Sequence, residues 1–288
     1  MNGDAFSFEL ATADGVTLFG RAWMPSAPRA VIALVHGINE HSGRYGFLAE
    51  RAGQRGLGVV SVDLRGHGRS PGVRAYVESF DDYLFDVDAL LDKARELAAG
   101  RPVFLMGHSM GGAIALRWVA QRGPRVAGLA LSSAALKIGG DVPRLLVWLA
   151  PFLSRWLPRM RGTRLNPEVI SRDPAVVAAY LADPLVTQMA PPARTGAELL
   201  RTMELNRHSA PAIRLPVYLF HGDADRLTDP VGSREIHDLW GGADRSLRLW
   251  PGSRHETLND LDREAVVAEL LDWLLVRGQM NAANAEIK

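Results

Sequence analysis

The sequence predicts an α/β fold in which a mostly parallel sheet carries helices on both faces. Short runs rich in Val, Ile and Leu recur along the chain, and helical patterns separate most of them. These runs are apolar almost without interruption, as expected for strands that are buried on both faces. The chain has 288 residues, of which 47% are hydrophobic, which is enough for one full core.

Six apolar runs provide the predicted parallel strands, at 30–37, 57–64, 102–109, 126–134, 216–223 and 246–252. Before them, residues 6–24 form two strand-like halves around an Asp-Gly pair, which predicts an antiparallel hairpin at the edge of the sheet. The clearest helical pattern covers 79–100. Ser79 can cap this helix, acidic residues crowd its first turn, and Gly100 can end it.

Residues 136–209 break the alternation of strands and helices. This segment is too long for a loop within a compact domain, and it contains repeated prolines and an apolar, aromatic stretch at 142–160. We therefore expect a helical insertion, called the cap below, over the C-terminal edge of the sheet. The α/β core then consists of residues 1–135 and 210–288.

Two interpretations of the aromatic stretch in the cap remain open. Six basic residues and one acidic residue lie between Lys137 and Arg164. The stretch either packs its apolar face on the core with its arginines solvated, or it rests transiently on a membrane surface. In the second case the aromatic side chains would enter the lipid and the arginines would meet anionic head groups.

Composition excludes several classes of function. A net charge of +1 gives no reason to expect a nucleic-acid partner, and the lack of cysteine excludes disulfides and a thiol nucleophile. The sequence has no H-E-x-x-H motif, so we expect neither a catalytic metal nor a cofactor. The first residues lack the basic segment and following apolar stretch that are typical of a signal peptide, so we expect a cytoplasmic protein. The oligomeric state is left open.

The stretch "VFLMGHSMGGAIAL" (103–116) contains the pattern G-x-S-x-G between a predicted strand and a predicted helix. This context is the one that a serine nucleophile on a sharp turn requires. Glycines two positions before and after the serine let the strand and the helix approach each other. The alternative is a glycine-rich turn with no chemistry. The context favours Ser109 as the nucleophile.

A serine nucleophile needs a histidine base and an acid that orients the base. With this motif the acid and then the histidine follow the serine in the chain, each after a late strand. Of the four later histidines, only His255 follows the last predicted strand, at the sheet edge where active sites of open α/β sheets lie. His208 falls in the cap, His237 lies within a helical pattern, and His221 closes a buried strand and is interpreted as structural.

The acid is expected in "HGDADRLTDP" (221–230). Asp225 has the reach to lie beside a histidine loop that follows the next strand, and Asp223 is its rival. Asp229 precedes a proline at a predicted helix start, so we interpret it as an N-cap.

These residues resemble the α/β-hydrolases, and among them the monoacylglycerol lipase and lysophospholipase group. The resemblance covers nearly the whole chain and rests on five motifs in family order: "HGINEHSGRY" (36–45), "DLRGHGRSPG" (63–72), "GHSMGG" (107–112), "HGDADRLTDP" (221–230) and "SRHETLND" (253–260). It implies an α/β-hydrolase fold with Ser109, Asp225 and His255 as the catalytic triad. It also implies that the backbone N–H groups of Ile38 and Met110 form the oxyanion hole.

The resemblance further implies a lipid ester as substrate, most directly a monoacylglycerol. A lysophospholipid or a simple carboxylic ester is the nearest alternative, and an acyltransferase or a non-catalytic binding module is more remote. Glu40 and Arg44 would line the polar end of the pocket near the glycerol, or else form an ion pair that secures their loop. The sequence departs from animal-type members at Leu258, where they tend to have a second histidine.

Overall fold

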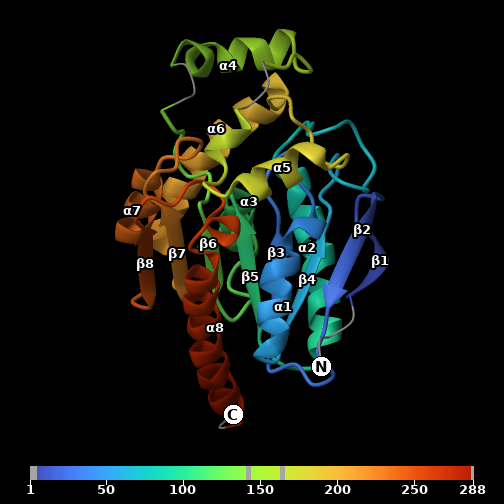
Figure 1. Ribbon diagram of the computed structural model, residues 1–288, viewed down its shortest axis with the longest axis vertical. Coiled ribbons are helices and arrows are strands. Elements are labelled where there is room, and N and C mark those ends of the chain that lie inside the picture. The colour runs from blue at the N-terminus through green and yellow to red at the C-terminus, as the bar shows by residue number, and fades with distance from the viewer. Residues whose placement is uncertain (1–4, 141–143, 163–165, 287–288) are drawn as a thin grey trace.

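The computed structural model describes residues 5–140, 144–162 and 166–286. Its centre is an eight-stranded sheet in the order β1-β2-β4-β3-β5-β6-β7-β8 (Figure 1). The strands are β1 (Ala5–Ala11), β2 (Thr17–Trp23), β3 (Ala30–Val35), β4 (Leu57–Val62), β5 (Val103–His108), β6 (Leu129–Ser132), β7 (Val217–Gly222) and β8 (Arg245–Trp250). Strands β3 to β8 run parallel, and β1 and β2 form an antiparallel hairpin at the edge. The predicted fold class, the six parallel strands and the edge hairpin are confirmed.

Helices cover both faces of the sheet and one of its ends. They are α1 (Gly46–Gln54), α2 (Asp82–Ala98), α3 (Met110–Arg122), α4 (Arg144–Trp156), α5 (Pro174–Ala182), α6 (Ala193–Ser209), α7 (Pro230–Leu239) and α8 (Arg263–Glu286). Short 3₁₀ turns occupy Ser42–Tyr45, Pro167–Val169, Ala210–Ala212 and Thr257–Asn259.

Helix α2 begins three residues after Ser79, the residue predicted to cap it. The helix begins at Asp82, and its N-cap residue Asp81 makes no side-chain capping bond. Two tight turns precede the helix instead, in which the N–H groups of Asp82 and Tyr83 donate to the carbonyl oxygens of Ser79 and Phe80. Ser79 makes capping contacts at these turns, because its Oγ accepts the N–H of Asp81 at 3.3 Å and its own N–H donates to Asp82 Oδ2 at 3.2 Å.

Successive side chains of β3 point to opposite faces of the sheet and pack in two separate apolar clusters. Val31, Ala33 and Val35 pack in the cluster that contains α2 and α3, whereas Ile32 and Leu34 pack in the cluster that contains α1 and α8. All five side chains are fully buried. A strand buried on both faces must be apolar at every position, which explains the uninterrupted apolar runs in the sequence.

Helices α4, α5 and α6 lie between β6 and β7 in the chain and gather at one end of the sheet (Figure 1). Helix α6 is tied to α3 by the Asn206 side-chain amide, which donates to the carbonyl oxygen of Ala113 at 2.9 Å. The range expected for the cap contains these three helices. Asp141 and Arg164, which contribute to its charge, lie outside the described residues.

Candidate active site

Ser109 lies at the sharp turn between β5 and α3. Its backbone has φ 53° and ψ −121°, a strained conformation for any residue other than glycine. A Cβ on Gly107 would lie 2.2 Å from the carbonyl oxygen of Gly111, and a Cβ on Gly111 would lie 2.2 Å from that of Val35. Only glycine therefore allows the two elements to come this close around Ser109, which is the reason the sequence pattern predicts.

Ser109, His255 and Asp225 form one hydrogen-bonded chain. Ser109 Oγ is 2.9 Å from His255 Nε2, and His255 Nδ1 is 2.7 Å from Asp225 Oδ2. Because a carboxylate can only accept, Nδ1 carries the ring proton and Nε2 is free to accept a proton from the serine. All three side chains are buried. The structure thus brings together the three residues that the sequence singles out.

The two rival aspartates lie elsewhere in the same loop. The exposed Asp223 accepts the N–H of Gly252 at 2.6 Å. Asp229 accepts the N–H of Val231 at 2.9 Å at the start of α7, which confirms its interpretation as an N-cap.

The Asp225 carboxylate is held by several donors. Oδ1 accepts the N–H groups of Leu227 at 2.9 Å and Thr228 at 3.2 Å, and Oδ2 accepts the Thr228 hydroxyl at 2.8 Å. His221 Nε2 lies 3.0 Å from the same Oδ2. Burial opposes ionisation of Asp225, but the charge of His255 and the bonds from both histidines hold its pKa far below its usual range. Asp225 is therefore an ionised acceptor.

His255 and His108 have opposite electrostatic environments. Burial lowers the pKa of His255, but the charge and hydrogen bond of Asp225 outweigh it, so the pKa is raised overall. The ring of His108 lies 5.0 Å from that of His255, and burial together with His255 lowers its pKa to about 4. His108 is therefore neutral, and its Nδ1 is 3.1 Å from Ser132 Oγ, as befits a structural residue.

The segment 36–41, called the oxyanion loop below, passes beside Ser109. A Cβ on Gly37 would lie 3.1 Å from that of Ser109, and Ile38 follows directly. The loop is fixed by the N–H of Gly37, which donates to Glu40 Oε1 at 2.6 Å. Met110 is the first residue of α3, where backbone N–H groups lack partners within the helix. The two expected oxyanion donors therefore belong to segments that adjoin Ser109.

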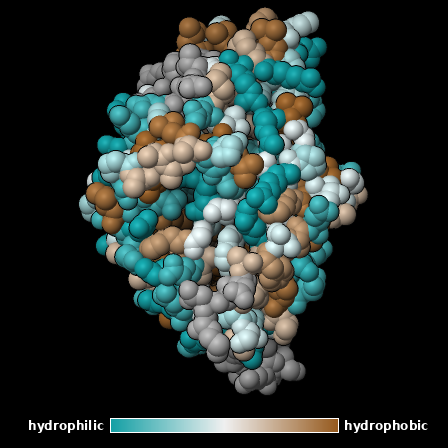
Figure 2. Space-filling model, turned by 45° about the vertical axis from the view of Figure 1, so that its right-hand side comes forward, coloured by the Kyte–Doolittle hydropathy of each residue, from teal (hydrophilic) through white to brown (hydrophobic). Residues whose placement is uncertain are grey.

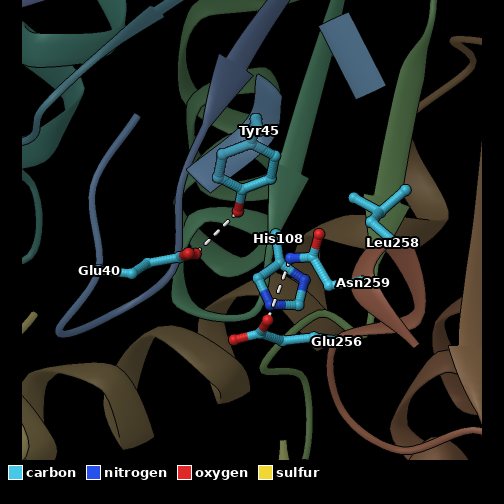
Figure 3. Close-up of a pocket in the computed structure, with 6 residues that line it drawn as sticks. All are labelled: Glu40, Tyr45, His108, Glu256, Leu258 and Asn259. Carbon is cyan, nitrogen blue, oxygen red and sulfur yellow. Dashed lines mark hydrogen bonds between the residues drawn. The ribbon is translucent and has the colours of Figure 1, made fainter. Parts of the chain in front are cut away.

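Glu40 and Arg44 meet in a buried ion-pair cluster that includes Glu256. Arg44 Nη1 is 3.0 Å from Glu40 Oε2, and the guanidinium is bound by both oxygens of Glu256 at 2.6 and 2.8 Å. Tyr45 donates its hydroxyl to Glu40 at 2.8 Å. Figure 3 shows Glu40, Tyr45, His108 and Glu256 around one small polar pocket. Burial raises the pKa of Glu40, but Arg44 and neighbouring charges outweigh it and lower the pKa to about 2.

The sequence does not predict two residues of the site, Glu256 and His221, the second histidine that contacts Asp225. Glu256 directly follows the catalytic histidine candidate, but its partner Arg44 lies 212 positions earlier, so no local pattern links them. The sequence indicates a structural role for His221, and nothing in its strand shows that it touches the acid. Its spacing of four residues from Asp225 was the one available indication.

Hydrogen bonds join the oxyanion loop to the cap above the site. The Asn39 side-chain amide donates to the carbonyl oxygen of Met189 at 2.9 Å, and the Thr187 N–H donates to that of Asn39 at 2.8 Å. His41 Nε2 lies 2.8 Å from Asp183 Oδ2. The cap residues 183–189 therefore contact the loop that is expected to supply an oxyanion donor.

Helix α4 exposes a large apolar surface at the end of the molecule that lies beyond the sheet. Trp148, Phe152 and Trp156 are 76%, 59% and 64% exposed, and hydrophobic residues gather at this end in Figure 2. Arg155 and Arg159 are exposed beside them. Contiguous exposed aromatic side chains are typical of surfaces that meet another apolar phase.

Metal sites and membrane-spanning helices are two other features that bear on function. In the ranges 5–140, 144–162 and 166–286, no group of three or more His, Cys, Asp or Glu side chains is arranged to hold a metal ion. Within the same ranges, no helix combines the length and the apolar character that crossing a membrane requires.

Comparison with known proteins extends these observations. The family model for serine aminopeptidase, S33, matches residues 26–262. A monoacylglycerol lipase of Mycolicibacterium smegmatis is 34% identical over 262 residues, which are 91% of this chain and 94% of the relative. The phospholipase YtpA of Bacillus subtilis is 34% identical over 85% of this chain and 94% of its own. The crystal structure of Paleococcus ferrophilus monoacylglycerol lipase has a TM-score of 0.81 and 32% identity, and covers 90% of this chain and 99% of its own.

Proposed function

The chain belongs to the serine aminopeptidase S33 family of α/β-hydrolases, and from its similarity to monoacylglycerol lipases we propose that it cleaves monoacylglycerol into glycerol and a fatty acid. At the coarser level it is a carboxylic ester hydrolase that acts on lipid esters. The observation that supports the proposal most directly is the hydrogen-bonded chain from Asp225 through His255 to Ser109.

Ser109 is the proposed nucleophile. His255 Nε2 takes its hydroxyl proton as Oγ attacks the ester carbonyl carbon, and the N–H groups of Ile38 and Met110 bind the oxygen that becomes negative. His255 then gives the proton to the alkoxide oxygen as the C–O bond breaks and the alcohol departs. Water, with His255 again as the base, attacks the acyl-enzyme and releases the fatty acid. Asp225 stays ionised and stabilises the imidazolium that forms twice in the cycle.

Glu40 and Arg44 secure the oxyanion loop in this proposal. Glu40 accepts the N–H that precedes the Ile38 donor, and Arg44 is engaged by two carboxylates. Glu40 is buried, the side chain of Arg44 is 10% exposed, and Arg44 also stacks over the ring of Tyr180 at 4.8 Å. Side chains with this many partners favour the ion-pair interpretation over direct binding of a glycerol hydroxyl group.

Esters of lysophospholipids form the second candidate substrate class. The specific observation in its favour is a phospholipase that is as similar in sequence as the monoacylglycerol lipase. A simple carboxylic ester remains a third option. An acyltransferase would use the same three residues and exclude water, and a non-catalytic binding module has no need for the Ser109–His255 contact.

The cap forms a lipid-facing surface in this proposal. Exposed aromatic side chains on α4, flanked by arginines, have the composition of a surface that rests on a bilayer with anionic head groups. The enzyme would then be peripheral to a membrane during turnover. The division into a core of residues 1–135 and 210–288 with a cap at 136–209 belongs to the same proposal. Cytoplasmic localisation stays a prediction of the sequence.

A direct assay of ester hydrolysis tests the proposed function. Fatty acid release from a monoacylglycerol and from a soluble short-chain ester is measured for the parent and for Ser109→Ala, with Ser209→Ala as the matched control. We expect Ser109→Ala to lose activity by on the order of 10⁴-fold or more on both substrates. Parent-like turnover by Ser109→Ala would end the proposal. A higher kcat/KM for a lysophospholipid than for monoacylglycerols of any chain length would move the substrate to the second class.

A further inference from the structure

A second histidine binds the carboxylate that orients the catalytic base. His221, near the end of β7, is fully buried, and its Nε2 lies 3.0 Å from Asp225 Oδ2, the oxygen that also accepts His255 Nδ1 at 2.7 Å. The other ring nitrogen of His221, Nδ1, lies 2.8 Å from the hydroxyl of Ser233 on α7. His221 therefore bridges the acid and a helix behind it, and the mechanism described above does not use it.

The surroundings of His221 determine which ring nitrogen carries the proton. Nε2 faces two acceptors that cannot donate, Asp225 Oδ2 and the carbonyl oxygen of Thr228 at 3.3 Å. An unprotonated Nε2 would direct its lone pair at the lone pairs of these two oxygens, and the contacts would be repulsive. Nε2 therefore carries the hydrogen. Nδ1 then accepts the hydroxyl proton of Ser233. In this tautomer every contact of the ring pairs a donor with an acceptor.

The end of β7 holds His221 and Asp225 close to His255. A Cβ on Gly222, which lies between the two, would come within 2.2 Å of the carbonyl oxygen of Ser253. The strand end therefore packs directly against the segment that carries His255. The Thr228 hydroxyl lies between the rings, 3.2 Å from His221 Nε2 and 3.3 Å from His255 Nδ1.

From this geometry we propose that His221 is a positioning residue for the catalytic reaction, whose Nε2–H holds Oδ2 of Asp225 and shares that oxygen with His255. The proposal rests on the proposed function. A hydrogen bond to a carboxylate stabilises its charged form and lowers its affinity for further protons. With His221 in place, Asp225 is fixed in one rotamer and offers His255 only part of the negative charge of Oδ2.

Loss of the His221 donor has two expected consequences. Oδ2 then has only His255 and the Thr228 hydroxyl as partners, so more of its charge acts on His255, the imidazolium is more stable, and His255 releases its proton at higher pH. The carboxylate is also less well oriented, so the chemical step slows. The other groups that act on His255 are His108, Glu256 and Glu40, and none of them changes in such a variant.

The experiment compares His221→Phe, which removes the donor, with His221→Gln, whose amide N–H can replace Nε2–H. The kcat/KM profile of Ser109-dependent hydrolysis of a soluble ester is measured against pH. We expect His221→Phe to shift the low-pH side of the kcat/KM profile to higher pH by on the order of half a pH unit. It should also lower kcat about tenfold with little change in KM. His221→Gln should restore most of both. His208→Phe, which replaces an exposed histidine on α6 whose ring bonds the Glu204 carbonyl oxygen of its own helix, is the control and should leave the profile unchanged.

Two results would overturn the proposal. One is a His221→Phe profile that superimposes on the parent profile, or a His221→Gln variant no better than His221→Phe. The other comes from the unmodified protein and needs no variant to fold: ¹⁵N NMR should show His221 with its proton on Nε2, and a proton on Nδ1 instead contradicts the assignment. Failure of the proposed function looks different, because the parent would then show no Ser109-dependent turnover while the NMR result stands.

Discussion

The contrast between Asp225 and Asp223 shows how a single loop separates a catalytic candidate from a structural residue. The two carboxylates are two positions apart after the same strand. Asp225 turns inward, where two histidines, a hydroxyl and two backbone N–H groups bind it, whereas Asp223 stays exposed and accepts one backbone N–H. A buried, fully bonded carboxylate keeps its charge and its orientation, and both are needed to hold a histidine in the correct tautomer.

Asparagine substitution distinguishes the two aspartates. We expect Asp225→Asn to lower kcat by on the order of 10⁴-fold, because an amide at this position can donate to His255 Nδ1 and favour the wrong tautomer. Asp223→Asn should change kcat by less than about threefold, since its one bond lies outside the site. Steady-state kinetics on a soluble ester measure both. A crippled Asp223→Asn with an active Asp225→Asn would transfer the role of the acid to Asp223.

The pH dependence of activity follows from His255. In its proposed role as the base, His255 can accept a proton only when it is neutral, and the net effect of burial and Asp225 is to raise its pKa. The kcat/KM of a soluble ester should therefore fall as the pH drops through a value above the ordinary histidine pKa of about 6.5. The measurement covers about pH 5 to about pH 9. A flat profile on the acid side would argue against a histidine base.

Much of the site could be predicted from the sequence because its parts are local. The G-x-S-x-G turn, the oxyanion loop and the helix cap at Asp229 each depend on residues within a few positions of one another. The contacts of His221 and Glu256 could not be predicted in the same way. They depend on how the ends of different strands pack, so the pairs Arg44–Glu256 and His221–Ser233 only become visible in three dimensions.

Among the elements, helix α4 departs most from an ordinary amphipathic helix on a protein surface. Such a helix turns its apolar stripe toward the core. In α4 the aromatic side chains of Trp148, Phe152 and Trp156 face outward and leave their apolar area in water. An apolar surface of this kind has a free-energy cost in solution that a lipid surface would remove, at about 25 cal/mol for each Å² that is covered.

Binding to vesicles tests the role of α4. If the helix rests on lipid, the protein should bind anionic vesicles more tightly than neutral ones, and salt should weaken the binding. Arg155→Glu combined with Arg159→Glu should reduce binding to anionic vesicles by roughly tenfold or more, at about 1 kcal/mol for each charge near the surface. Hydrolysis of a soluble short-chain ester should be unchanged. Co-sedimentation at two salt concentrations measures the binding.

The matched control carries the same charge change at the opposite end of the sheet. Arg101 and Arg125 are exposed there, before β5 and after α3. Their double replacement by glutamate should leave binding to vesicles nearly as it is. Equal and salt-insensitive binding to neutral and anionic vesicles by the parent would exclude the membrane interpretation and leave α4 as an outer layer of the cap.

At the scale of the whole molecule, stability and chemistry occupy different regions. The two apolar clusters fill the space between the sheet and its helices, and the candidate catalytic residues lie at strand ends beyond them. The central strands that carry the turn of Ser109 are fully buried. A rigid centre can therefore hold loops that need particular, partly strained conformations.

Leucine truncation measures the contribution of this centre. Leu131, on β6, is fully buried, whereas Leu261 is 62% exposed. We expect Leu131→Ala to lower the free energy of unfolding by about 2–5 kcal/mol, because it leaves a cavity in the apolar cluster on the face of the sheet that α2 and α3 cover. Leu261→Ala should change it by less than about 0.5 kcal/mol. Urea unfolding followed by circular dichroism gives both values. Equal effects of the two truncations would contradict the assignment of the core.

The chain enters the sheet through β1 and leaves it through β8, which α8 follows, and Figure 1 shows the start of β1 and the end of α8 on the side of the molecule away from α4. An enzyme attached to a bead or an electrode by a tag at either end would turn its cap and the proposed nucleophile Ser109 toward the bulk liquid. Oil droplets in an emulsion could then reach the exposed tryptophans without obstruction from the support. Because the described ends of the chain lie away from the cap, a tag at either terminus orients the immobilised protein. No residue near the site has to be changed.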